Sequence, residues 1–214
     1  MSATYSVSIT NGGNQLDTFS LYVAAMDFGS AYRAEPTFIQ LSWISFSPTS
    51  PSAPACGTTA TTLTITVPPD WAGMEDAIYD FNVVVKGSFS TDTDLAAGQL
   101  LVHATPTSMM FYVRVEIQHL IDDVLALPPS DVRDGLLDKA NSTLAKVNQA
   151  IDRYLMGDDP PASNLFETCQ NKLNAFLHLL DAQRGKELTT TQADDLATKA
   201  QQIIDDLSTV LAAI

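Results

Sequence analysis

The sequence predicts two segregated domains, an antiparallel β-sandwich over residues 1–105 followed by a four-helix bundle over residues 106–214. Up to about Pro106, apolar residues alternate with polar ones at every second position, which is the period of half-buried strands. Beyond Pro106, apolar residues recur every three or four positions, which is the period of amphipathic helices. With 214 residues and a hydrophobic fraction of 45%, the chain is long enough to bury two small cores.

Short alternating runs separated by turn residues predict the strands of the first half. Tyr5, Val7 and Ile9 alternate with Ser and Thr, and Asn11-Gly-Gly-Asn14 then supplies residues that tolerate a tight turn. Further runs have apolar residues at Phe19, Leu21, Val23 and Ala25, at Ile39, Leu41 and Trp43, at Leu63, Ile65 and Val67, and at Tyr79, Phe81, Val83 and Val85. A last strand is expected over about 99–104. About six or seven short strands of this kind suit a Greek-key sandwich.

The amino-acid sequences of three of these runs resemble those of a known group of modules. Trp43-Ile-Ser-Phe-Ser-Pro48, Leu63-Thr-Ile-Thr-Val-Pro68 and Tyr79-Asp-Phe-Asn-Val-Val-Val85 resemble the immunoglobulin-like modules of secreted archaeal and bacterial proteins, the CARDB-like and NEW-type repeats. The resemblance spans about residues 4–105 and implies an Ig-like sandwich in a secreted protein. The segment 27–36 is longer than the corresponding segment expected in these modules. Tyr79 is expected to form either a tyrosine corner or an ordinary part of the core.

Capping residues delimit four helices in the second half. Thr105 and Ser130 precede the first two apolar stripes, and Thr189-Thr-Thr-Gln192 forms a capping box before the last. Gly185 is expected to end the third helix in a left-handed conformation. Gly157 and the pair Pro160-Pro161 are expected to close the second helix, with residues 158–162 as a variable loop. Each helix then has one apolar face to bury, so the four are expected to pack as a bundle.

The last two helices carry a second resemblance. Asn171-Lys-Leu-Asn-Ala-Phe176, Ala182-Gln-Arg-Gly-Lys186 and Ala200-Gln-Gln-Ile-Ile-Asp205 resemble the FIMAH domain, a helical module near the C-terminus of extracellular bacterial and archaeal proteins. The resemblance spans about residues 110–207 and implies a cell-surface setting without a catalytic residue. Arg184 and Lys186 are expected to stabilise a helix C-terminus, with an anion-binding patch as the alternative.

The chain lacks the motifs of the common catalytic classes. Its histidines, His103, His119 and His178, have no second His or Cys at the spacing of zinc ligands. No nucleophile elbow, phosphate loop or dinucleotide fingerprint occurs. We therefore expect no enzyme and no obligatory cofactor. The net charge of −14 disfavours nucleic acids and anionic lipids as partners, and no apolar stretch is long enough to span a membrane.

Two kinds of candidate binding residue remain. Asp92 and Asp94, and Asp158 and Asp159, are expected on loops, where paired carboxylates are candidates for Ca²⁺ ligands. Trp71 lies in an expected turn, where a carbohydrate-binding module presents aromatic rings, although it could instead plug the end of the sandwich. Phe89 lies in a turn as well. Cys169 falls on an apolar helix face and is expected in the core, unpaired with Cys56.

These observations favour a non-catalytic extracellular or cell-surface region with a structural or adhesion role. The sandwich would serve as a spacer and the helical module as a docking surface, and we expect a protein partner or self-association. Two alternatives stay open, a carbohydrate-binding accessory module of a secreted enzyme and a self-assembling filament or layer subunit. The setting would be extracellular if the chain belongs to a larger secreted protein, and cytoplasmic if the chain is complete.

Overall fold

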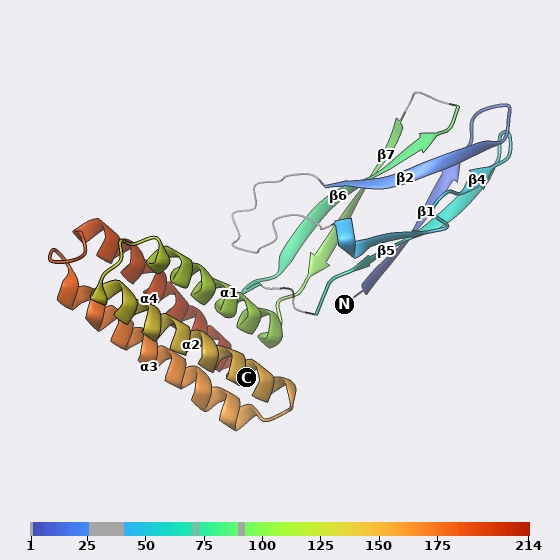
Figure 1. The fold of residues 1–214 in the computed structure, drawn as a ribbon. Helices are drawn as coiled ribbons and strands as arrows, with labels where there is room; N and C mark the ends of the chain where they lie inside the picture. The colour runs from blue at the N-terminus through green and yellow to red at the C-terminus, as the bar shows by residue number, and fades with distance from the viewer. Residues whose placement is uncertain (1, 26–40, 70, 72, 90–92) are drawn as a thin grey trace. The chain divides into compact units, whose positions relative to one another are not determined.

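The computed structural model describes residues 2–25, 41–69, 71, 73–89 and 93–214. The chain divides into two compact units, one made of Met1–Trp71 with Glu75–His103 and the other of Ala72–Met74 with Ala104–Ile214. The first unit consists of strands and the second of helices (Figure 1). The predicted fold class, an antiparallel sandwich followed by four helices, is confirmed.

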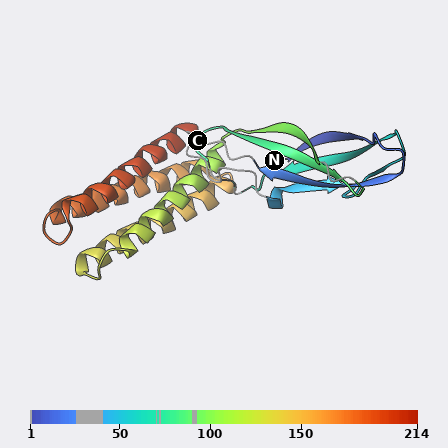
Figure 2. The ribbon, with the colours of Figure 1, turned by 90° about the horizontal axis from the view of Figure 1, so that it is seen from above.

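Two antiparallel sheets form the strand unit (Figures 1 and 2). The first sheet has the order β1-β5-β3, with β1 at Ser2–Thr10, β5 at Thr58–Thr66 and β3 at Ile44–Ser47. The second has the order β4-β2-β6-β7, with β4 at Ser52–Ala53, β2 at Asp17–Ala25, β6 at Ala77–Gly87 and β7 at Thr93–Val102. Among the described strands, β1 and β7 therefore each lie at the edge of a sheet.

The core of the sandwich comes from the alternation that the sequence shows. Leu63 and Ile65 of β5 are buried against Val23 of β2 and Phe81 of β6. Because successive side chains of a strand point to opposite faces, the residues between them lie on the outer faces. The register pairs Val23 with Val83, so inward-facing apolar residues meet across the sheet.

Two strand predictions need correction. The third run was expected to be a strand over residues 39–43, but Leu41–Trp43 is a short 3-10 helix, η1, and the strand is β3, Ile44–Ser47. Ile44 and Phe46 pair with Ile65 and Leu63 of β5, which places the strand there. Ile39 and the segment 27–36 lie outside the described residues.

The last strand is also longer than expected. β7 covers Thr93–Val102 rather than about 99–104, because it forms a long hairpin with β6. Ala96, Ala97 and Gly98 are small, so this part of β7 lacks the alternation of large apolar residues that predicts a strand. At Gly98 a small residue is required by the structure. A Cβ on Gly98 would collide with the ring of Phe81, its pairing partner in β6.

The helical unit contains α1 (Pro106–Leu125), α2 (Asp131–Leu155), α3 (Asp159–Gln183) and α4 (Thr190–Ala213). The predicted caps are confirmed. The hydroxyls of Thr105, Ser130 and Thr189 each accept a hydrogen bond from the third following backbone N–H, at 3.1–3.2 Å. Gly185 has φ +70°, as a left-handed helix end requires.

The prediction of a loop at residues 158–162 is wrong. α3 begins at Asp159, so Pro160 and Pro161 belong to its first turn. The first backbone N–H groups of a helix have no partner within the helix, and proline therefore costs little there. Gly157, with φ +79°, makes the turn between α2 and α3.

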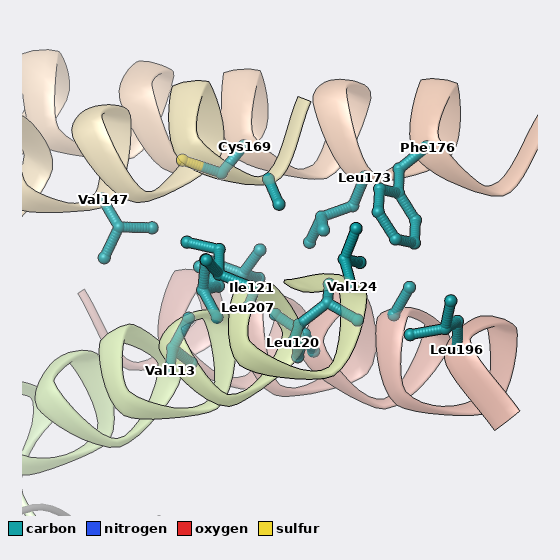
Figure 3. Packing of buried hydrophobic residues seen from close by; sticks show 14 of the residues in the cluster. Val113, Leu120, Ile121, Val124, Val147, Cys169, Leu173, Phe176, Leu196 and Leu207 are labelled. Atoms are coloured by element: carbon teal, nitrogen blue, oxygen red, sulfur yellow. The ribbon is translucent and has the colours of Figure 1, made fainter. Parts of the chain in front are cut away.

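The four helices share one apolar core (Figure 3). α3 contributes Cys169, Leu173 and Phe176, and all three are fully buried. They face side chains from α1 and α4 such as Val124 and Leu207, which are fully buried as well (Figure 3). Met74 packs against this core, and the N–H of Gly73 donates to the carbonyl of Ser108 at 3.1 Å. None of the helices in the described part of the chain is long and apolar enough to cross a lipid bilayer.

Candidate functional site

The outer face of the four-stranded sheet carries apolar side chains where a solvated face would be polar. Tyr22 of β2, Val84 of β6 and Leu95 of β7 are neighbours across three strands. Tyr22 and Leu95 are 51% and 61% exposed, but Val84 between them is only 4% exposed. Further along the sheet, Ile78 pairs with Leu101 and both are exposed. We call these five residues the outer apolar face.

Charged side chains accompany the outer apolar face on β6. Asp80 and Lys86 are in phase with Ile78 and Val84, so they project to the same side of the sheet. Asp80 is held in place, because its carboxylate accepts a hydrogen bond from the side-chain amide of Gln99 at 2.9 Å. The face therefore combines apolar area with one fixed negative group and one positive group.

A second feature is a groove of about 690 Å³ between β1 and β7. Val7 and Ile9 from β1 line it together with Phe19 and Val85 from the other sheet. Near Tyr5 the two edges are bridged, because the hydroxyl of Tyr5 donates to the carbonyl oxygen of Gln99 at 3.2 Å. The groove is therefore an opening between the two sheets rather than a hollow in one of them.

Asp17, one of the two acidic residues of this groove, is fixed by hydrogen bonds from Ser88 and Thr18. Asp17 Oδ1 accepts hydrogen bonds from the hydroxyl of Ser88 at 2.6 Å and from the N–H groups of Ser88 and Thr18. The Ser88 hydroxyl is the largest cause that lowers the pKa of Asp17 below its ordinary value, and the backbone donors act in the same direction. Asp17 is therefore ionised at neutral pH, and the groove carries a permanent negative charge.

Trp71 does not present a surface for stacking. Its side chain is 4% exposed, and its indole N–H donates to the hydroxyl of Tyr79 at 2.9 Å. Burial raises the pKa of Tyr79, so the hydroxyl stays protonated and accepts this bond. Tyr79 also packs edge-to-face against Trp43, with ring centroids 5.9 Å apart. Trp71 thus plugs the sandwich, and its expected role as a glycan ligand lacks an accessible ring.

Neither acidic pair proposed for Ca²⁺ forms a cluster of ligands among the described residues. Asp92 lies outside the described residues, and Asp94 belongs to β7 rather than to a loop. One oxygen of Asp94 accepts the N–H of Leu95 at 2.9 Å. Asp158 is paired with Arg153 at 2.9 Å, and Asp159 begins α3. Within the described ranges, no group of three or more His, Cys, Asp or Glu residues could hold a metal ion.

Arg184 and Lys186 make local contacts at the C-terminal end of α3. The guanidinium of Arg184 is paired with the carboxylates of Asp194 and Asp181, and Lys186 Nζ donates to the carbonyl oxygen of Ala182 at 2.7 Å. These partners already occupy the positive groups that an anion-binding patch would need.

The two cysteines are free, and they differ in accessibility. Cys56 is exposed, whereas Cys169 is buried in the bundle and its pKa is raised to about 12, mainly by burial. We expect a thiol reagent at neutral pH to modify Cys56 alone in the folded protein and to reach Cys169 only in denaturant. Titration with Ellman's reagent measures this. Equal reaction of both thiols in the native protein would contradict the core position of Cys169.

No family model and no curated protein matches this chain. Solved structures that match include an MSP-domain protein-like family member, SSP-19, from Caenorhabditis elegans, with 10% identity and a TM-score of 0.28 over 48% of this chain and 88% of that one. PapD-like domain 7 of human CEP192 has 16% identity and a TM-score of 0.31 over 49% of this chain and 72% of that one. The CupB2 chaperone of Pseudomonas aeruginosa has 12% identity and a TM-score of 0.28 over 46% of each chain. At these scores the matches carry no argument about function.

Sequence reasoning missed both the outer apolar face and the groove. A signal for the first was present, because Tyr22, Val84 and Leu95 are apolar residues out of phase with the core positions of their strands. The groove had no such signal, since its position depends on which strands lie at the sheet edges.

Proposed function

We propose that this chain is a non-catalytic structural or adhesion region of an extracellular, cell-surface prokaryotic protein. The sandwich acts as a spacer and assembly surface, and the helical unit acts as a docking module. The outer apolar face is the observation that carries the proposal. Four of its five side chains are exposed, and exposed apolar side chains on a sheet mark an interaction surface, because each is stabilised by leaving water.

A second copy of the chain is the partner that this face fits best. If two outer apolar faces stacked about a two-fold axis that lies between them, across the strand direction and level with Val83, Lys86 of one copy would lie opposite Asp80 of the other. The same operation would set Asn82 opposite Val84 and bring Tyr22 and Leu95 of both copies into the contact. Such a contact uses the same surface twice, which is the usual geometry of a dimer. The two ion pairs would fix its register.

The extracellular setting rests on the two sequence resemblances. The CARDB- and NEW-type modules and the FIMAH domain occur in secreted multidomain proteins, and their motif residues fall on β3, β5 and β6 and on the last two helices. The FIMAH-like residues around Gly185 have structural partners here, which supports a role for them in stabilising the end of α3.

A glycan-binding function is the second candidate, and one residue favours it. Phe89 is 79% exposed in the turn after β6 and borders the groove. An exposed ring at that place could stack on a sugar. Because Trp71 is buried, this candidate now depends on Phe89.

Light scattering across a concentration series tests the proposed function. We expect the wild-type mass to rise with concentration and Leu95→Lys to keep the chain monomeric, because a charged side chain on the outer apolar face cannot be buried unpaired. Met156→Lys is the matched control, since Met156 is an exposed apolar residue of the helical unit. This variant should associate like the wild type. A wild-type monomer at every concentration would contradict the proposal.

A further inference from the structure

The inner side of β7 is exposed where the inner side of a sandwich should be buried. Ala96 pairs with Val83 and Asp94 pairs with Val85, and both partners face the interior. Ala96 and Asp94 are therefore on the inner face of their strand, yet both are exposed. Further along β7, Leu100 and Val102 occupy the same face and are buried. The sandwich is thus open along the first half of β7.

The opening also has main-chain groups turned towards it. The carbonyl oxygen of Gln99 accepts from Tyr5, and the N–H of Leu95 donates to the side chain of Asp94. Both bonds lie outside the ladder with β6, which indicates that these main-chain groups face away from that strand. In an antiparallel ladder this orientation repeats at every second residue, so the N–H and C=O of Ala97 have it as well. Because β7 is an edge strand, its main chain at Ala97, between these two bonded groups, is where another strand can extend the sheet.

The floor and rim of the groove define the chemistry of an occupant. Val7 and Ile9 alternate on β1, and Phe19 and Val85 face them from the second sheet, so alternate side chains of an inserted strand would meet apolar surface. Asp17 and Asp94 supply two carboxylates, and no Lys, Arg or His occurs among the described residues that line the groove. The charge is complementary to a basic peptide.

We propose that the groove between β1 and β7 binds an extended peptide segment of another polypeptide by strand addition to β7. The segment has alternating apolar side chains, which enter the groove, and a Lys or Arg residue at the end that lies by the start of β7, where Asp17 and Asp94 both are. Main-chain hydrogen bonds to β7 supply affinity, and the apolar floor and the carboxylates supply selectivity. This goes beyond the proposed function, because the groove lies between the two sheets and the outer apolar face lies on the other side of the second sheet, with Leu95 bordering both.

A matched pair of variants separates the two surfaces. Ala96 and Ala97 are adjacent and both exposed, but they lie on opposite faces of β7. Ala96→Lys places a cation and a long side chain in the groove, whereas Ala97→Lys places the same group on the outer side of the sheet. The two variants have the same composition and net charge. Thermal unfolding of each verifies that it folds.

The probe is a fluorescein-labelled peptide of sequence Lys-Thr-Val-Thr-Val-Thr-Val-Thr-Lys, with a control in which proline replaces the central valine. We expect anisotropy to show binding to the wild-type chain, weakened by added salt. Ala97→Lys should bind within about twofold of the wild type, and Ala96→Lys should bind about tenfold more weakly or worse. The proline peptide should lose binding, because it lacks a main-chain donor. In light scattering the order of the two variants should be reversed. Ala97→Lys should self-associate less than the wild type, and Ala96→Lys should self-associate like the wild type.

Three results would overturn the proposal. They are the absence of peptide binding to the wild type, equal binding by the two variants, and binding of a cello-oligosaccharide in place of the peptide. If Ala96→Lys does not fold, the site is tested instead by adding the peptide to the wild-type chain and following its backbone amide resonances. The peptide should shift those of Leu95 and Ala97, and shifts confined to the helical unit would count against the groove.

Discussion

Phe176→Ala is expected to lower the free energy of unfolding of the helical unit by about 3–5 kcal/mol. The ring is fully buried in the shared core of the four helices, where it lies near Leu173, Val124 and Leu196 (Figure 3). Truncation removes its apolar contacts and leaves a cavity that rigid helices cannot close. A typical domain has a total stability of only ~5–15 kcal/mol, so the loss is a large part of it.

Chemical denaturation followed by the helical circular dichroism signal measures this loss. Leu125→Ala is the matched control, because Leu125 is an apolar residue of α1 that is largely exposed. Its effect should stay within about 0.5 kcal/mol. If both substitutions changed the unfolding midpoint equally, the four helices would not share the core described here.

Trp71→Ala is expected to destabilise the sandwich by about 3–5 kcal/mol. The substitution empties the space of a buried indole, removes a hydrogen bond and leaves the hydroxyl of Tyr79 without its donor. Trp71→Phe keeps most of the packing and should cost less. Tyr79→Phe leaves the indole N–H buried without its acceptor, which costs ~1–3 kcal/mol.

Denaturation followed by the fluorescence of the remaining Trp43 reports on this core. Phe89→Ala is the control, because that ring is exposed and its loss should leave stability unchanged. A Trp71→Ala chain with wild-type stability but without glycan binding would contradict the structural role and restore Trp71 as a ligand.

The helices could be predicted closely because their signals are local. Thr105, Ser130 and Thr189 cap helices through bonds that span three residues, and Gly185 ends one by its own conformation. The misplaced residues 158–162 show the limit of this reasoning. Proline is compatible with both a loop and a first helical turn, and the packing of α3 against the other helices is not visible in that segment.

The strand unit could be predicted in class but less well in detail. Strand pairing joins residues far apart in the sequence, as when β6 selects Thr93–Leu95 as part of β7 despite the small residues that follow. The burial of Trp71 likewise depends on its bond to Tyr79. The outer apolar face requires Tyr22, Val84 and Leu95 to be in register, and the groove requires β1 and β7 to be edges. Such facts follow from topology rather than from local spacing.

The central claim is that the outer apolar face mediates association, and a methyl NMR dilution series tests it most directly. We predict that the methyl resonances of Ile78, Val84 and Leu95 shift with concentration, whereas those of Leu173 and Leu180 in the helical core do not. The contradictory result is a set of outer-face resonances that stay constant over the whole range, or shifts that occur only at Leu155 and Met156 on the helical unit.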